Sequence, residues 1–120
     1  MIEPAYFFDT YAFFEILKDN PHYTPYRYTK VLTTQFNIAE FYWALLREKR
    51  SYAEDAARHR ATASTPVTLD DIIAAMQLRV MHPKLSIPDA IGYTVAKRHG
   101  VKFLTGDKEF EKMDNVEFVK

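Results

Sequence analysis

Hydrophobic positions along the chain alternate between short continuous runs and helical spacing, and this pattern predicts strands alternating with helices. Residues 5–8, "AYFF", form a brief apolar run after a proline, which is typical of a buried strand. Residues 11–19 then repeat with helical spacing, and Pro21 ends that helix. The segment 21–30 contains two prolines and three tyrosines, which predicts an irregular connection.

The middle of the chain predicts three helices and one uncertain strand. The helices are a strong one from about Thr34 to residue 50, a more polar one over 51–64 and a third over 70–83. Residues 67–69, "VTL", are a candidate for the second strand. We expect Asp70 or Asp71 to cap the start of the third helix.

The last part of the chain carries the clearest helix boundaries. Over residues 86–100, Ser86 is a candidate N-cap and Gly100 ends the helix. A strand over 101–105, a short helix and a final strand over 116–119 follow. Strands that alternate with helices favour an α/β fold, here a three-layer sandwich with a short central parallel sheet of about four or five strands flanked by helices.

Composition narrows the possible classes of function. The chain has 120 residues, enough for one domain with its own core, so we treat residues 1–120 as a single domain. Its 16 basic and 16 acidic residues cancel, which argues against a strongly basic nucleic-acid binder but not against a nuclease. The lack of cysteine excludes disulfide scaffolds and thiolate chemistry and fits a cytoplasmic protein. No uncharged apolar run reaches about 18 residues, so we expect no membrane span.

Four acidic residues stand where a lone carboxylate is costly. Asp9 follows the first strand and Asp107 follows the strand over 101–105, so both lie at the carboxyl edge of a parallel sheet. Asp89 lies in the first turn of the helix that leads into the second of these strands. Glu40 lies within a helix that is apolar almost all round, where a carboxylate needs a partner.

Each acid also has a purely structural explanation. The two acids after strands could cap the helices that follow them, and Asp89 could complete a capping box with Ser86. Glu40 could pair with Arg47 or with a cation from another helix. Two carboxylates about 4 Å apart, however, repel by about 4 kcal/mol at an effective dielectric of 20, and a helix N-terminus recovers only about 0.3–1 kcal/mol. A proton or a bound cation must supply the difference, and carboxylate-only ligands favour Mg²⁺ or Mn²⁺.

Four motifs in order carry a family resemblance. They are "FFDT" (7–10), "NIAE" (37–40), "SIPDAIGYTVAKRHG" (86–100) and "FLTGDKEF" (103–110). Their order resembles that of a PIN domain, and the chain looks like a VapC-type toxin endoribonuclease over essentially its whole length. No single motif is specific, whereas the ordered set of four is.

The resemblance implies a set of site residues, a cofactor and partners. It implies that the catalytic and metal-binding acids are Asp9, Glu40, Asp89 and Asp107. Thr10 and Thr105 match hydroxyl positions beside these acids and are expected to support them without binding metal themselves. It further implies Mg²⁺ or Mn²⁺, an RNA substrate, a cognate antitoxin protein that holds the toxin inactive, and a homodimer.

Substrate contacts are expected from basic residues around the acids. The candidates are Arg47, Lys49, Arg50 and Lys108, each of which could equally be an ordinary solvated charge. One alternative function is a non-catalytic PIN-like RNA-binding or scaffold domain, which the full acidic set argues against. Another is a phosphatase with Asp9 as nucleophile, but the further lysine and acids of that chemistry have no matching set in the sequence.

Overall fold

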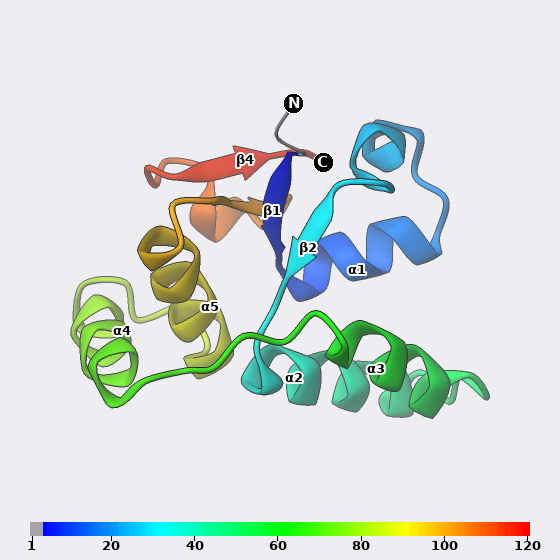
Figure 1. Cartoon of the computed structure of the whole chain (residues 1–120), viewed down its shortest axis with the longest axis horizontal. Coiled ribbons are helices and arrows are strands. Elements are labelled where there is room, and N and C mark those ends of the chain that lie inside the picture. Colours follow the sequence, from blue (N-terminus) through cyan, green and yellow to red (C-terminus); the bar gives the residue numbers. More distant parts are fainter. Residues whose placement is uncertain (1–3) are drawn as a thin grey trace.

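A computed structural model describes residues 4–120 and contains a sheet of four parallel strands (Figure 1). The strands are β1 (Ala5–Phe8), β2 (Lys30–Leu32), β3 (Lys102–Thr105) and β4 (Val116–Phe118). Their order in the sheet is β2-β1-β3-β4, with every pairing parallel. All four carboxyl ends therefore meet at one edge of the sheet, and β1 and β3 lie side by side at its centre.

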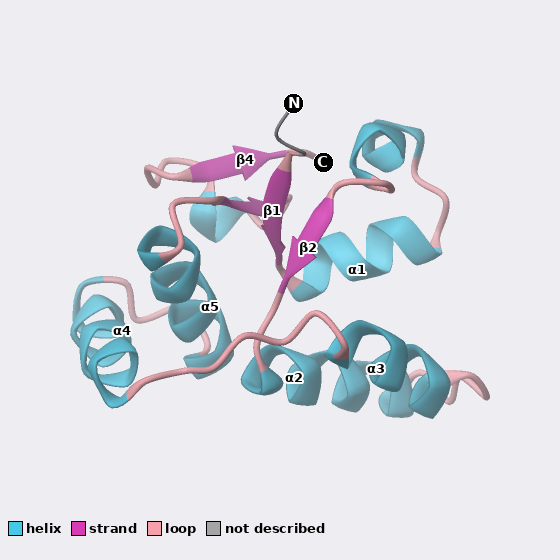
Figure 2. Cartoon of the chain, in the orientation of Figure 1, coloured by secondary structure: helices cyan, strands magenta, loops and turns pink. Residues whose placement is uncertain are grey.

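Helices cover both faces of this sheet (Figure 2). They are α1 (Thr10–Leu17), the 3₁₀ helix η1 (Pro21–Tyr26), α2 (Gln35–Arg47), α3 (Ala53–Ala61), α4 (Leu69–Met81), α5 (Ile87–Arg98) and the 3₁₀ helix η2 (Lys108–Phe110). In Figure 1, α4 and α5 lie on one side of the sheet, α1 and η1 on the other, and α2 and α3 beyond its carboxyl edge. Among residues 4–120, no helix is long and apolar enough to cross a membrane.

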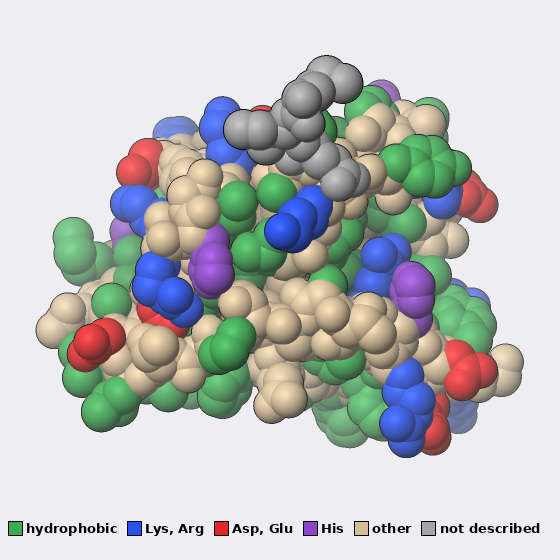
Figure 3. All heavy atoms as spheres, in the orientation of Figure 1, with side chains coloured by type: hydrophobic (Ala, Val, Ile, Leu, Met, Phe, Trp, Pro, Cys, Tyr) green, Lys and Arg blue, Asp and Glu red, His purple; other side chains and the backbone are tan. Residues whose placement is uncertain are grey.

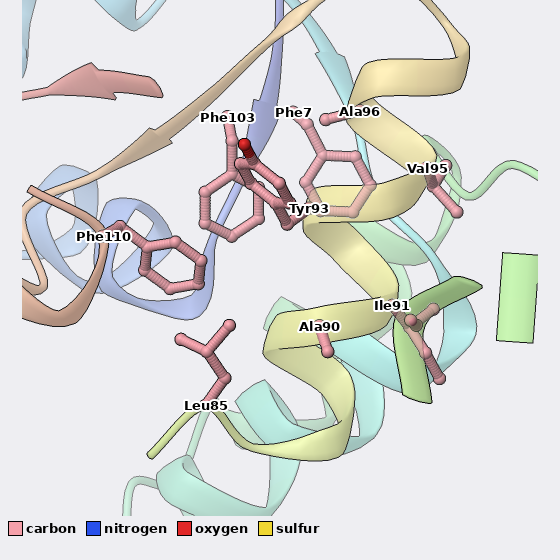
Figure 4. Packing of buried hydrophobic residues seen from close by; sticks show 10 residues of the cluster. Phe7, Leu85, Ala90, Ile91, Tyr93, Val95, Ala96, Phe103 and Phe110 are labelled. Atoms are coloured by element: carbon pink, nitrogen blue, oxygen red, sulfur yellow. The ribbon is translucent and has the colours of Figure 1, made fainter. Parts of the chain in front are cut away.

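Successive side chains of the central strands point to opposite faces of the sheet, and they form two hydrophobic cores. Phe7 and Phe103 point toward α5, where they join a cluster that includes Phe110; Figure 4 shows this packing. The rings of Phe103 and Phe110 have centroids 4.6 Å apart. Phe8 and Leu104 point the other way, into a second cluster formed with α1 and α2. This two-sided burial confirms the three-layer α/β sandwich expected from the sequence.

The second strand is not where the sequence placed it. Residues 67–69 form no strand, because the Thr68 side chain accepts a hydrogen bond from the Asp71 amide and begins α4. The N-cap of α4 is thus Thr68 and not Asp70 or Asp71. The second strand is instead β2, whose first amide donates to the Pro4 carbonyl at 2.8 Å.

Candidate active site

Asp9 lies at the carboxyl end of β1 and is only 3% exposed. Its Oδ1 accepts from the Thr10 amide at 2.8 Å, so it caps α1, as its structural explanation expects. Its Oδ2 accepts from the hydroxyl of the fully buried Thr105 at 2.7 Å. Both carboxylate oxygens of Asp9 are therefore held by hydrogen-bond donors. One donor is the residue that follows Asp9, and the other lies on the neighbouring strand β3.

Glu40 reaches the same place from α2. Its Oε1 accepts from the Thr10 hydroxyl and its Oε2 from the Ser86 hydroxyl, each at 2.9 Å. The helix itself is fixed by the fully buried Asn37, whose Nδ2 donates to the Pro88 carbonyl at 3.1 Å. Glu40 is thus held by hydroxyl groups, and among residues 4–120 it forms no ion pair with Arg47 or any other cation.

Asp89 approaches from the first turn of α5. It completes the capping box, since its Oδ2 accepts from the Ser86 amide and its own amide donates to the Ser86 hydroxyl, both at 3.1 Å. Carboxylate oxygens of Asp9, Glu40 and Asp89 lie within 4.8 Å of one another. Three segments distant in sequence therefore bring their acids together.

Asp107 lines the same cavity but stands outside that group of three. Its Oδ1 accepts from the Glu109 amide at 3.0 Å and so caps η2. Its own amide donates to the Thr105 hydroxyl at 3.0 Å, and that hydroxyl in turn donates to Asp9. One threonine therefore connects the two acids that follow β1 and β3.

Burial and neighbouring negative charge raise the affinity of Asp9 and Asp89 for protons. Burial, followed by the charge of Asp89, raises the pKa of Asp9 well above its usual value, and the hydrogen bond from Thr105 opposes this only in part. Burial and the charge of Glu40 raise the pKa of Asp89 to about 6. None of the ion pairs among residues 4–120 involves Asp9, Glu40, Asp89 or Asp107. Within the described residues, no protein cation therefore neutralises these acids by direct contact.

These features fit a hard divalent cation. Every candidate ligand atom in the group of three is a carboxylate oxygen, which is the donor type that Mg²⁺ and Mn²⁺ prefer. A divalent ion would also supply positive charge in direct contact with the three carboxylates, which no ion pair among residues 4–120 provides. The group of three acids could thus hold one metal ion.

The acids open into a cavity of about 430 Å³. Of the basic residues expected to contact substrate, Arg47 lines this cavity, whereas Lys49, Arg50 and Lys108 are not among its lining residues. Lys18 lines it too, a residue that sequence reasoning missed. The sequence carries a signal for Lys18, because it lies four residues after Phe14 and eight after Thr10. This spacing puts all three residues on one face of α1 and its C-cap.

Comparison with models of known protein families shows which family the chain belongs to. The family described as PIN domain matches residues 6–116. The chain belongs to the PIN domain family. The resemblance seen in the four motifs is therefore confirmed, and in this PIN domain the four acids stand at the carboxyl edge of the sheet or face it.

Solved structures show the same PIN domain architecture at low sequence identity. The chain is similar to a protein of a toxin–antitoxin complex from Klebsiella pneumoniae (TM-score 0.72, 18% identity, 92% of this chain and 94% of that one). It is similar to PAE2754 from Pyrobaculum aerophilum (TM-score 0.73, 19% identity, 98% and 92%). It is also similar to Mycobacterium tuberculosis VapC20, described as a toxin that cleaves the sarcin–ricin loop (TM-score 0.73, 23% identity, 95% and 96%). No curated protein sequence matches the chain.

Proposed function

We propose that this PIN domain is a metal-dependent endoribonuclease that hydrolyses RNA phosphodiester bonds and acts as the toxin of a toxin–antitoxin pair. The observation that carries the proposal is the meeting of Asp9, Glu40 and Asp89 within 4.8 Å, beside Asp107, with no ion pair to any of these acids among residues 4–120. Membership of the PIN family and the structural likeness to toxins support it. A cytoplasmic location, where RNA is available, belongs to the same proposal.

In this proposal Asp9, Glu40, Asp89 and Asp107 hold Mg²⁺ or Mn²⁺. A divalent ion bound there would lower the pKa of a water molecule and offset negative charge on the scissile phosphate. Hydroxyl groups of Thr10 and Thr105 donate to Glu40 and Asp9 and so keep the carboxylates aimed at the cavity. Any of the four carboxylates that does not bind the ion directly would be available to accept a proton from a water molecule.

Basic residues at the cavity would guide the substrate. Lys18 and Arg47 line the same space as the acids, and they place positive charge where an RNA backbone would pass. Lys49 and Arg50 lie just beyond the C-cap of α2 and Lys108 follows Asp107, and we assign these three exposed residues to further substrate contacts outside the cavity lining. The acids alone would repel RNA, so these basic residues provide the attraction.

Two apolar surfaces support the proposed partners. On α2, Phe36, Trp43 and Leu46 are 42–60% exposed, next to the cavity that Arg47 lines, and we assign this surface to the cognate antitoxin. On α4, Leu69 and Val80 are 70% and 83% exposed, and apolar side chains gather over this helix in Figure 3. We assign this second surface to a homodimer.

Cleavage of RNA by the purified, partner-free chain tests the function. We expect cleavage with Mn²⁺ or Mg²⁺, none in EDTA, and a loss of about 10²–10⁴-fold for Asp9→Asn, because the neutral amide neither binds a cation nor accepts a proton as well. Asp114→Asn, a change in an acid outside the cavity, is the matched control and should cleave normally. RNA binding without cleavage under any divalent ion, unchanged in Asp9→Asn, would instead identify the non-catalytic RNA-binding domain.

A further inference from the structure

Two helix-capping boxes of the same design occur within the described residues 4–120. At α4 the Thr68 hydroxyl accepts from the Asp71 amide at 3.1 Å, and Asp71 Oδ2 accepts from the Thr68 amide at 2.9 Å. At α5 the Ser86 hydroxyl accepts from the Asp89 amide, and Asp89 Oδ2 accepts from the Ser86 amide, both at 3.1 Å. Local helix capping is therefore satisfied equally at both sites, and any difference between them must come from their surroundings.

The α4 box is neutralised within the protein. Arg98 donates from Nε to Asp71 Oδ1 at 2.8 Å and from Nη2 to Asp71 Oδ2 at 2.9 Å. Within residues 4–120, the Thr68 hydroxyl donates to no recorded acceptor. The charge of the cap acid Asp71 is thus neutralised by Arg98, and the role of the α4 box is purely structural.

The α5 box differs in both respects. The Ser86 hydroxyl donates to Glu40 Oε2 at 2.9 Å, a contact across 46 positions of the chain. Its cap acid, Asp89, forms no ion pair with a Lys, Arg or His among residues 4–120 and instead lies in the group of three acids. The Ser86 hydroxyl accepts the Asp89 amide hydrogen, so its own hydrogen is free to be donated to Glu40. The Ser86 oxygen therefore links two residues that are candidate metal ligands, Glu40 and Asp89.

We propose that Ser86 is a positioning residue of the metal site: its hydroxyl holds Glu40 against the first turn of α5, close enough to Asp89 for both carboxylates to hold one ion. This inference rests on the proposed function, because it assumes that these acids bind a metal. Without the hydroxyl, Glu40 would keep only the hydrogen bond from Thr10 and could swing away from Asp89, whose like charge repels it. Asp89 itself would stay fixed at the start of its helix.

The test compares Ser86→Ala with Thr68→Ala in the full chain. Both variants lose an N-cap hydroxyl, so both should lower the melting temperature by a similar amount. The affinity for Mn²⁺, measured by electron paramagnetic resonance of the free ion, should fall about 10–100-fold in Ser86→Ala and stay near wild type in Thr68→Ala. Ser86→Thr keeps a hydroxyl and should restore most of the affinity.

Glycine variants separate capping from donation. Glycine at an N-cap costs the helix only a few tenths of a kcal/mol, so Ser86→Gly keeps the fold if Ser86→Ala does not, yet it cannot donate to Glu40. It should show the same loss of Mn²⁺ affinity, and Thr68→Gly should not. Equal Mn²⁺ binding by Ser86→Gly and Thr68→Gly would overturn the role of Ser86 while leaving the metal site in place. A wild-type chain that binds no Mn²⁺ would overturn the proposed function itself, and this inference with it.

Discussion

At the scale of single residues, the acids of this PIN domain do two things at once. Asp9 and Asp107 cap helices and Asp89 completes a capping box, as their structural explanations require. Capping, however, uses only hydrogen-bond donors and supplies no full positive charge. Structural and functional explanations are therefore compatible here, because the same geometry that caps the helices also brings the carboxylates together.

Stability of the metal-free protein should depend on pH in a direction set by Asp89. Its pKa is about 6 in the folded chain against an ordinary value of 3.8, so the folded state binds the proton more tightly than the unfolded state does. The free energy of unfolding in EDTA should be highest at low pH within this range and should fall as pH rises from about 4 to about 6–7, by on the order of 2 kcal/mol.

Urea unfolding followed by circular dichroism at several pH values measures this slope. Asp89→Asn removes one of the two titrating acids and should make the slope shallower, while Asp9, whose pKa is also raised, keeps the same direction of change. Added Mn²⁺ should stabilise the wild type more at pH 7.5 than at pH 5, because protons and the cation compete for the same oxygens. A metal-free profile that rises between pH 4 and 7 would contradict this assignment.

Two glycines near the strands should respond very differently to alanine. A Cβ at Gly106 would lie 2.4 Å from the ring of Tyr11 and from the Val119 carbonyl, so the loop that carries Asp107 would have to move. A Cβ at Gly100 meets open space, and only the positive φ of 69° opposes it. We expect Gly106→Ala to cost about 3 kcal/mol or more and to lower cleavage, and Gly100→Ala to cost about 1 kcal/mol with cleavage retained. Similar costs for both, measured by urea unfolding, would argue against the tight packing at Gly106.

At the scale of elements, the sequence predicts what is encoded locally. Residues 86–98 carry their own cap, and the run at 5–8 is apolar, so α5 and β1 were recognised. The strand β2 was missed because its three residues become a strand only by pairing with β1, which is remote in sequence. Asp9 and Asp107 are predictable from their positions at strand ends, and Glu40 from the apolar helix around it, whereas the link from Ser86 to Glu40 crosses between helices and leaves no signal in either segment.

Docking of α2 on α5 should depend on Asn37. Its amide is fully buried, donates to the Pro88 carbonyl at 3.1 Å and accepts from the Thr34 hydroxyl at 2.6 Å. Asn37→Ala leaves the Pro88 carbonyl without this donor and should lower the free energy of unfolding by about 1–3 kcal/mol. Because Glu40 lies one turn further along α2, RNA cleavage should fall as well.

The exposed Gln35 provides the control for that change. Gln35→Ala alters the same helix without touching α5 and should leave both stability and cleavage near wild type. Differential scanning fluorimetry and an RNA cleavage assay at saturating Mn²⁺ measure the two effects. An Asn37→Ala protein as stable and as active as Gln35→Ala would show that this contact does not set the position of α2.

At the scale of the whole molecule, net neutrality conceals a local separation of charge. The four acids share one cavity, while Figure 3 shows Lys, Arg, Asp and Glu interspersed on the face it draws. No charge of one sign dominates that face. The exposed apolar surfaces of α2 and α4 are therefore the features that we assign to protein partners. These surfaces belong to different helices, so an antitoxin and a second copy of the chain could occupy them at the same time.

The homodimer assigned to α4 can be tested without affecting the site. Leu69 and Val80 lie on α4, which packs on α5 on one side of the sheet, whereas the acids gather at its carboxyl edge. Burying a large apolar side chain at an interface contributes about 1.5–3 kcal/mol to the free energy of association. Because 1.4 kcal/mol corresponds to about tenfold in the dissociation constant, Val80→Glu should weaken self-association by more than about tenfold. Sedimentation velocity should show a dimer for the wild type and for Thr24→Glu, which adds the same charge at an exposed polar position of η1 on the other side of the sheet, and a monomer for Val80→Glu. Mn²⁺ affinity should be equal in all three, because none of these changes reaches the carboxylates. A wild type that sediments as a monomer, or a Val80→Glu protein that stays dimeric, would place the dimer interface elsewhere or remove it.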